Sequence, residues 1–518
     1  MDNDIEDLVK TTTRGSLILL IGQVSSTFIL AIGVLLVARF LGPSNFGSFS
    51  KAQSVVSIAV LLMSLGVQPA IVKYLAQYRH EGKTEYLRVF IEAGLIINLV
   101  SSVVLTFVVY LLSGFIANTI FNEAAQELFI KYLSISIIGQ AFSTLAQGIT
   151  VGYERMELRS LISIAYSFIK SIISPILVYI GLGTLGAVLG QTSPLLLSGA
   201  IGIFFIALIY RNEKAEQSPI THLEAIKTIL TYGFPLYLAS LLGGLLPQIY
   251  TTLLGVWETN ERIGNYSVAM NFSVLLSFVT LPISTTIFPL FSKLKPEQGE
   301  LAFLYRNAVK YSTLFGYPII FTTVALADQI ITILFRHKYI YAAYYLRIYM
   351  LTFLLIGLGS VCNGSLLNGQ NRTDINFKST LAKFVVSLPL SFYAIQTYGV
   401  VGLLYTYFVT AAVNTGINFV YIRRIFGFKI NFQFLVKMLL ISLVASFSAY
   451  EFTGMISLHP WIEFFTGGLL SVLIYFVGIV VTKALTKQDY TYLLKLSDSF
   501  GPFSNVFRRL VNVLISFS

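Results

Sequence analysis

The sequence predicts an all-α polytopic membrane protein with about 14 transmembrane helices. Hydrophobic residues make up 55% of its 518 residues and charged residues 11%, and the mean hydropathy is +0.77. A chain of this composition has too little polar surface to fold as a water-soluble globule. Apolar runs of roughly 20 residues, which cross a ~30 Å hydrocarbon core as helices, recur from Gly15 almost to the C-terminus. Lipid is therefore the expected solvent of this chain.

The expected spans follow one another with short connections. They cover residues 15–37, 50–72, 89–112, 128–149, 160–180, 185–209, 228–254, 265–291, 308–327, 344–367, 377–396, 400–422, 433–452 and 461–482. No small-residue cleavage site follows the first run, so we expect it to be retained as a span. No extramembrane catalytic domain fits between the spans, and the phosphate-binding pattern G-x-x-x-x-G-K-[ST] is missing.

Positive charge is concentrated in alternate loops. Most of the 35 lysines and arginines fall in one set of loops, whereas the opposite set holds only Arg39, Lys51, Lys131, Arg262, Arg336, Lys338 and Arg347. By the positive-inside rule both termini are cytoplasmic, which agrees with an even number of spans. The formal charge of +11 does not indicate a nucleic-acid partner, because no basic stretch outside the spans is interleaved with aromatic residues.

The chain repeats itself at an offset of about 217 residues over six spans. Gly47 aligns with Gly264, and Gly152 aligns with Gly369. Because six is even, the copies share one orientation and form parallel repeats related by an axis along the membrane normal. The expected domains are an N-terminal six-helix lobe at 1–210, a cytoplasmic linker at 211–227, a C-terminal six-helix lobe at 228–424, and two additional helices with a cytoplasmic tail at 425–518.

No catalytic or metal-binding set of residues stands out. Cys362 lies in an apolar run. Because it is the single cysteine, an intramolecular disulfide and a cysteine-based metal cluster are excluded. The four histidines are scattered over both sides of the membrane. We therefore expect no enzyme activity, no metal and no cofactor, while coupling to a proton or sodium gradient stays open.

Two segments carry a family resemblance. VARFLGPSNFGSFSKAQS, followed by SLGVQPAIVKYLAQYRHEGK, resembles the start of the Wzx-type polysaccharide flippases, within the multidrug/oligosaccharidyl-lipid/polysaccharide exporter superfamily. LLNGQNRTDINFKSTLAKFVVSLPLSFYAIQTYGVVGLL is similar to that family's pattern of a short basic loop, a helix and a Y-G-x-x-G turn. The resemblance implies two six-helix lobes in a V shape, and flipping of polyprenyl-linked oligosaccharide from the cytoplasmic to the outer leaflet. Ser64 stands where the family commonly has an acidic residue.

Three cationic residues are candidates for binding an anionic phosphate linkage. Lys170 and Lys383 lie at membrane depth, where a charge costs about 2.5–3.5 kcal/mol on insertion scales. They either line a cationic cavity or extend their ammonium groups to an interface. Arg39 closes the first span, where it either binds phosphate or favours the helix C-terminal dipole.

Polar side chains form two stripes at helical spacing. They are Gln53, Ser57, Ser64 and Gln68 in the second span, and Ser273, Ser277, Thr280 and Ser284 in the eighth. We expect them to line a hydrated path for sugar; the alternative is hydrogen bonding between closely packed helices. Gln23 and Asn271 are further candidates for sugar contacts, because amides both donate to and accept from hydroxyl groups.

The expected function is therefore that of a flippase, working by alternating access, for lipid-linked oligosaccharide in cell-surface polysaccharide or glycan assembly. Its expected partners are the lipid-linked substrate, membrane lipid, and a polysaccharide polymerase or glycosyltransferases. Its expected place is the cytoplasmic membrane of a bacterium or archaeon. The alternatives are a cation-coupled multidrug exporter of the same fold and a membrane-embedded glycosyltransferase or polymerase.

Overall fold

The computed structural model describes residues 2–213, 218–295, 299–456, 458–486, 489–490, 494 and 508. Within this part the chain folds into helices and forms no strand, which confirms the all-α class. The helices of the first half are α1 (Asp2–Met63), α2 (Val67–His80), α3 (Leu87–Phe115), α4 (Ala125–Ser134), α5 (Ser136–Gly152), α6 (Met156–Leu177) and α7 (Gly183–Asn212). They are followed by α8 (His222–Trp257), α9 (Asn260–Asn271), α10 (Ser273–Lys293), α11 (Gly299–Ala325), α12 (Ala327–Phe335), α13 (Ala342–Leu351), α14 (Asn363–Gly369), α15 (Thr373–Phe426), α16 (Phe432–Met455) and α17 (Pro460–Val481).

Seven helices in the described residues are long and apolar enough to cross a membrane, or up to ten if each of three bent pairs is one span. Three of the seven cover two expected spans each, namely Ile21–His80, Met156–Arg211 and Thr373–Phe426. Each of these three contains a glycine whose backbone is not helical. The membrane fold is thus established, and the number of 14 spans stays a prediction.

Two of these breaks share one backbone conformation. Gly183 has φ 54° and ψ −135°, and Gly399 has φ 59° and ψ −138°. Both lie in a G-x-x-G turn, and both stand at the same place in the two copies of the repeat when the offset is shortened by one residue. This region of backbone space is open essentially to glycine alone. The two turns therefore have the same local structure as well as similar sequences.

Other expected spans are bent rather than continuous. The span expected at 50–72 is interrupted after Met63, where Leu65 and Gly66 adopt positive φ. The span expected at 344–367 passes from α13 through a 3-10 stretch at Thr352–Leu358 to α14. Apolar length alone did not predict these bends.

Contacts divide the chain into two compact units: unit 1 is Met1–Asn271 with Ser387–Leu403, and unit 2 is Phe272–Val386 with Leu404–Ser518. These units follow contacts, whereas the expected lobes follow the repeat, and the lobe boundaries stay a prediction. Residues 214–217 of the expected linker, and most of the tail after residue 490, lie outside the described residues.

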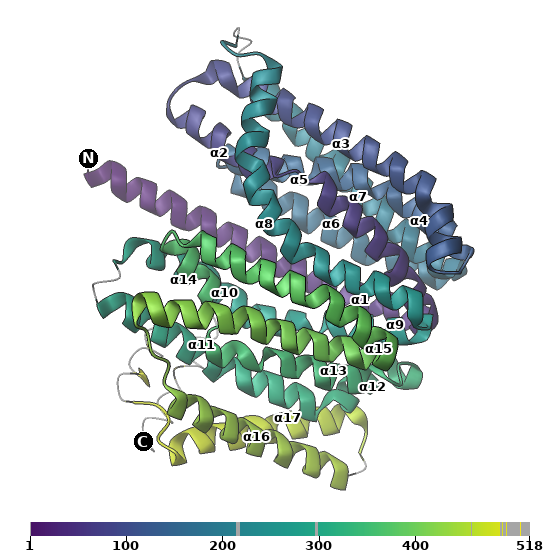
Figure 1. Cartoon of the computed structure of the whole chain (residues 1–518), viewed down its shortest axis with the longest axis vertical. Coiled ribbons are helices and arrows are strands. Elements are labelled where there is room, and N and C mark those ends of the chain that lie inside the picture. The colour runs from purple at the N-terminus through teal and green to yellow at the C-terminus, as the bar shows by residue number, and fades with distance from the viewer. Residues whose placement is uncertain are drawn as a thin grey trace. The chain divides into compact units, whose positions relative to one another are not determined.

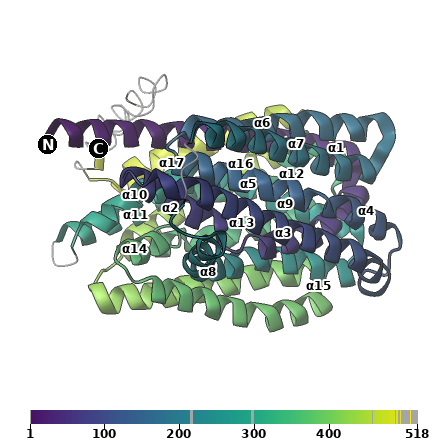
Figure 2. The same ribbon diagram turned by 90° about the horizontal axis from the view of Figure 1, so that it is seen from above.

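In unit 1, helices that are distant in sequence pack side by side. Figure 2 shows α1, α6 and α7 running together, and α5 also packs on α7. A buried core joins α2, α3 and α5 through residues such as Ile71, Phe90 and Leu145. By contrast, α3 exposes an apolar face that includes Val100, Val104, Phe107 and Leu111. An exposed apolar face of this extent suits contact with lipid.

Unit 2 is built around α11. Figure 1 shows α11 beside α16 and α17, and both of these helices contact it. A buried core joins α10, α11, α14 and α15 through Phe291, Tyr305, Leu366 and Ile422. The start of α16 is fixed by Asn431, whose side chain accepts a hydrogen bond from the Phe434 backbone N–H.

Candidate functional site

Lys170 lies on α6, directly before Ser171, which belongs to the face of α6 that packs on α1. That face is held by hydroxyl groups: Ser171 donates to the Ile29 carbonyl at 2.8 Å, and Ser160 donates to the Ile18 carbonyl at 3.2 Å. Lys170 is half-buried, and its Nζ lies 5.8 Å from the centroid of the Tyr166 ring. The neighbouring helix α7 contributes Gln191, whose amide donates to the Tyr166 hydroxyl at 3.4 Å. Lys170 therefore lies beside the hydrogen-bonded side chains of Tyr166 and Gln191 within unit 1.

Lys383 lies on α15 in unit 2 and is also half-buried. Neither Lys383 nor Lys170 forms an ion pair with any carboxylate among the described residues. Lys51, Lys131 and Lys310 do pair with carboxylates. Because a charge away from water needs a counter-charge, the two membrane-depth lysines are suited to an anion supplied from outside the chain.

Arg39 lies in the part of α1 that precedes the non-helical residue Gly42, and it is half-buried. No acceptor for its guanidinium is recorded among the described residues. Its position agrees both with phosphate binding and with a favourable interaction with the helix C-terminal dipole. Its role in phosphate binding therefore stays a prediction.

The first polar stripe is partly satisfied by the protein itself. The Gln53 amide donates to the Ser57 hydroxyl at 3.2 Å, and the Gln53 Oε1 is buried without a partner among the described atoms. The Ser64 hydroxyl donates to the Leu61 carbonyl at 3.0 Å, within its own turn. Gln68 is half-buried and lies against Gly148 of α5. Gln53 is the member of this stripe that has a buried acceptor without a described donor, and its contact with sugar stays a prediction.

The remaining polar candidates differ in exposure. Gln23 and Asn271 are exposed, and the Gln23 amide lies 3.4 Å from the Thr27 hydroxyl. Ser277 donates to the Val274 carbonyl at 2.7 Å, and Thr280 is half-buried. A hydroxyl group that donates to a carbonyl of its own helix needs no ligand to satisfy its hydrogen bond. Their contact with sugar stays a prediction.

One buried ionic cluster was missed by sequence reasoning. Lys51 of α1, only 3% exposed, donates to Glu123 in the loop before α4. The Asn260 amide at the start of α9 donates to both Glu123 oxygens, at 3.2 and 3.1 Å. Burial raises the Glu123 pKa, but the bonds from Lys51 and Asn260 outweigh it and hold the pKa below its ordinary value. The sequence showed only an outer-side lysine and a loop carboxylate, without a signal that joins them.

The two glycines matched by the repeat lie in direct contact within unit 1. A Cβ atom at Gly47 would overlap the Asn260 carbonyl oxygen, and one at Gly264 would overlap the Pro43 carbonyl oxygen. Pro43 and Asn260 are themselves equivalent under the repeat. The contact is therefore reciprocal, and it brings the backbones of α1 and α9 together beside the Lys51 cluster.

Two carboxylates near the span ends already have partners. Glu92 accepts hydrogen bonds from the Tyr210 hydroxyl and from His222, and Asp328 pairs with Arg347. In the described part of the chain, no group of three or more His, Cys, Asp or Glu side chains is arranged to hold a metal ion. Glu92 and Asp328 are therefore already engaged within the protein.

Known sequences that are similar to this chain are named for polysaccharide, glycan or lipopolysaccharide biosynthesis. The model of a family described as polysaccharide biosynthesis protein matches residues 12–295. A Haloferax volcanii protein named a probable low-salt glycan biosynthesis flippase, Agl15, is 22% identical over 93% of this chain and 98% of its own length. The Escherichia coli lipopolysaccharide biosynthesis protein WzxC is 22% identical over 78% of this chain and 80% of its own length.

Comparison with solved structures defines the fold. The lipid II flippase MurJ, in an inward closed conformation, superposes with a TM-score of 0.73 at 14% identity. The match covers 90% of this chain and 98% of that one. At this identity the likeness establishes the architecture alone.

Proposed function

We propose, from the premise that this chain belongs to the polysaccharide biosynthesis protein family, that it flips polyprenyl-(pyro)phosphate-linked oligosaccharide across the membrane. The direction is from the cytoplasmic to the outer leaflet, for cell-surface polysaccharide or glycan assembly. The relatives named as glycan biosynthesis and lipopolysaccharide biosynthesis proteins support this substrate class. Both termini are cytoplasmic in this proposal.

The observation that carries the proposal is the absence of a carboxylate partner for Lys170 and Lys383 among the described residues. Uncompensated cations at membrane depth are expensive, and they persist in proteins where they serve a function. A phosphate linkage supplies the missing negative charge, and its oxygens accept strong charge-assisted hydrogen bonds.

The neutral groups have a complementary role. The Gln53 Oε1 and the amides of Gln23 and Asn271 contact sugar hydroxyl groups, because amides match both donors and acceptors. The polyprenyl tail stays in the lipid throughout, against apolar faces such as that of α3. No cofactor takes part in this scheme.

The experiment is a flipping assay in proteoliposomes with a fluorescent polyprenyl-phosphate oligosaccharide. The Lys170→Ala, Lys383→Ala double variant is expected to flip it at least roughly tenfold more slowly, because each loss removes a charge-assisted bond to phosphate. The matched control is Lys227→Ala, Lys378→Ala, which removes two exposed lysines from α8 and α15.

The control is expected to flip at the native rate. Native-rate flipping by a folded Lys170, Lys383 double variant would remove these lysines from the mechanism. If the native chain flips no such lipid and instead exports organic cations, the exporter alternative replaces this proposal. Release of free or extended glycan from the lipid would instead indicate a transferase or polymerase.

A further inference from the structure

The face of α6 that carries Lys170 holds a second cation, Arg159. Ser163 and Tyr166 stand between them, so the four side chains follow one another at spacings of 4, 3 and 4. Residues at these spacings lie on one face of a helix, and all four are half-buried. The opposite side of α6 exposes large apolar side chains, namely Leu161, Phe168, Ile172 and Ile176. The polar face therefore points away from the surface that suits lipid and toward the neighbouring helices of unit 1.

Arg159 is a cation without a described counter-charge. No acceptor for its guanidinium is recorded among the described residues, and the neighbouring carboxylate of Glu157 is engaged by the Arg155 Nε at 2.7 Å. Arg159 also lies near the start of α6, which begins at Met156. The helix dipole places partial positive charge at that end and so disfavours a cation there. An arginine in this place is suited to an anion that comes from outside the chain.

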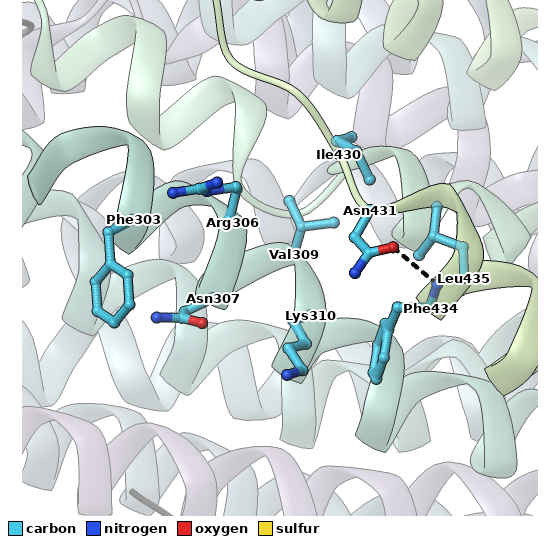
Figure 3. Close-up of a pocket in the computed structure, with 9 residues that line it drawn as sticks. All are labelled: Phe303, Arg306, Asn307, Val309, Lys310, Ile430, Asn431, Phe434 and Leu435. Atoms are coloured by element: carbon cyan, nitrogen blue, oxygen red, sulfur yellow. Dashed lines mark hydrogen bonds between the residues drawn. The ribbon is translucent and has the colours of Figure 1, made fainter. Parts of the chain in front are cut away.

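Lys310 of α11 shows the opposite arrangement in unit 2. It lies with Asn431 and Phe434 at the α11–α16 cavity, a space of about 280 Å³ between the first turns of α11 and the start of α16 (Figure 3). The Asp489 carboxylate lies 2.6 Å from the Lys310 Nζ, so the chain itself neutralises this cation. Lys310 therefore needs no anionic ligand, whereas Arg159 has no such carboxylate in the described part of the chain.

Neutral polar groups fill the interval between the two cations of α6. Ser163 donates to the Gln147 Oε1 of α5 at 3.5 Å, and the Tyr166 hydroxyl accepts from Gln191 of α7 at 3.4 Å. Because a helix rises 1.5 Å per residue, Arg159 and Lys170 are separated by roughly 16 Å along the axis. A single phosphate group is too small to span that distance. The two cations therefore mark two positions for an anion, and Arg159 marks the one at the end that is cytoplasmic in the proposed topology.

From this arrangement we propose that Arg159 is the first phosphate contact on the transport path. It binds the phosphate linkage of the lipid-linked substrate at the cytoplasmic entrance, before the linkage reaches Lys170. This inference rests on the proposed function and adds an entry site to it. A guanidinium suits this role, because its fork of N–H donors matches phosphate oxygens two at a time. Free phosphate and the headgroups of ordinary membrane lipids share this chemistry, so competition experiments distinguish these sources.

The dependence of the flipping rate on substrate concentration tests the proposal, in proteoliposomes with the fluorescent polyprenyl-phosphate oligosaccharide. Arg159→Gln is expected to raise KM roughly tenfold, because a charge-assisted bond is lost on entry, and to keep the maximal rate within about twofold, since Lys170 is intact. Lys170→Ala is expected to lower the maximal rate instead. The matched control is Arg211→Gln, which removes one positive charge from the exposed end of α7 and is expected to leave both quantities unchanged.

Equilibrium binding of the same lipid to the detergent-solubilised full chain provides a second measurement. Arg159→Gln is expected to bind it roughly tenfold more weakly than the native chain. Arg159→Lys guards against misfolding, because it keeps the charge, and it is expected to retain most of the affinity. An unchanged KM in a folded Arg159→Gln would overturn the proposal. A loss of maximal rate as large as that of Lys170→Ala would also overturn it, because Arg159 would then act in the transfer step.

The remaining outcomes separate this inference from the proposed function. Displacement of the bound lipid by an equal concentration of phosphatidylglycerol or of inorganic phosphate would identify a site for any phosphate group and overturn the inference. A native chain that binds the lipid through Arg159 but does not flip it would contradict the proposed function alone. A native chain that flips the lipid, while Arg159→Gln behaves like Arg211→Gln, would contradict the entry site alone.

Discussion

At the scale of single residues, the charged groups of this protein fall into two kinds. Lys51 is buried and pairs with the half-buried Glu123, and this pair links α1 to the loop before α4. Lys170 and Lys383 are half-buried without a described carboxylate. In the first arrangement, loss of either member is costly, because the other charge is then left without its partner. Binding of an anionic ligand by Lys170 and Lys383 stays a prediction.

The pH dependence of stability tests the Lys51 cluster. Because the Glu123 pKa is held below its ordinary value, the pair contributes stability at neutral pH and loses it as the pH falls through the folded-state pKa. Replacing Glu123 by Gln is expected to cost about 1–3 kcal/mol at neutral pH, since Lys51 loses its partner. Melting temperatures of both proteins across the acid range provide the measurement.

The gap between the two melting curves is expected to close in acid. The control is Glu127→Gln, which breaks a half-buried pair with Lys131 within one helix and is expected to change the melting temperature little. A gap of constant size from neutral to acidic pH would rule out titration of Glu123 as its cause.

At the scale of elements, one or two glycines join successive helices in place of a longer loop. The junctions at Gly183 and Gly399 turn the chain with almost the same φ and ψ. Their surroundings differ, however. No atom lies within 4 Å of a Cβ built at Gly183, whereas one at Gly399 would overlap a Glu258 carboxylate oxygen. That oxygen also accepts the Val400 N–H at 3.2 Å, so it is fixed at the junction.

Alanine substitutions separate these two effects. Gly183→Ala is expected to cost about 1–3 kcal/mol from backbone strain alone, and Gly399→Ala is expected to cost more, because Glu258 must also move. Gly243→Ala is the control, since its site is open and its backbone is helical. Thermal unfolding in one detergent ranks the three variants. Equal effects at Gly399 and Gly243 would contradict the assigned strain.

At the scale of the whole molecule, the distribution of charge predicts which loops share a side of the membrane. Cys362 is 1% exposed, so the native chain is expected to react little with a thiol reagent. Lys83→Cys and Arg155→Cys are expected to react with a membrane-impermeant maleimide from the cytoplasmic side, and Asn118→Cys from the outer side. Labelling of intact cells against inverted vesicles makes the comparison. Reaction of Lys83→Cys and Asn118→Cys from the same side would refute the span order.

Much of the fold could be predicted from the sequence, because hydropathy and charge act locally. Runs of apolar residues predicted the helical membrane class, and the repeat paired Gly47 with Gly264, which the structure places in contact. The Lys51, Glu123 and Asn260 cluster could not be found, because its members are brought together only by packing. The α11–α16 cavity was missed for the same reason. The bend at Gly66 was missed because apolar length does not record backbone dihedrals.

The short glycine junctions also decide where the chain is open to modification from outside. A protease needs several consecutive residues in extended form, and an inserted peptide tag needs a loop that tolerates added length. Gly42 and Gly399 each provide a single non-helical residue between two helices, and the junction between α6 and α7 has two, Gly181 and Gly183. Cleavage sites and tags therefore belong elsewhere, such as the segment from Glu81 to Lys83 between α2 and α3.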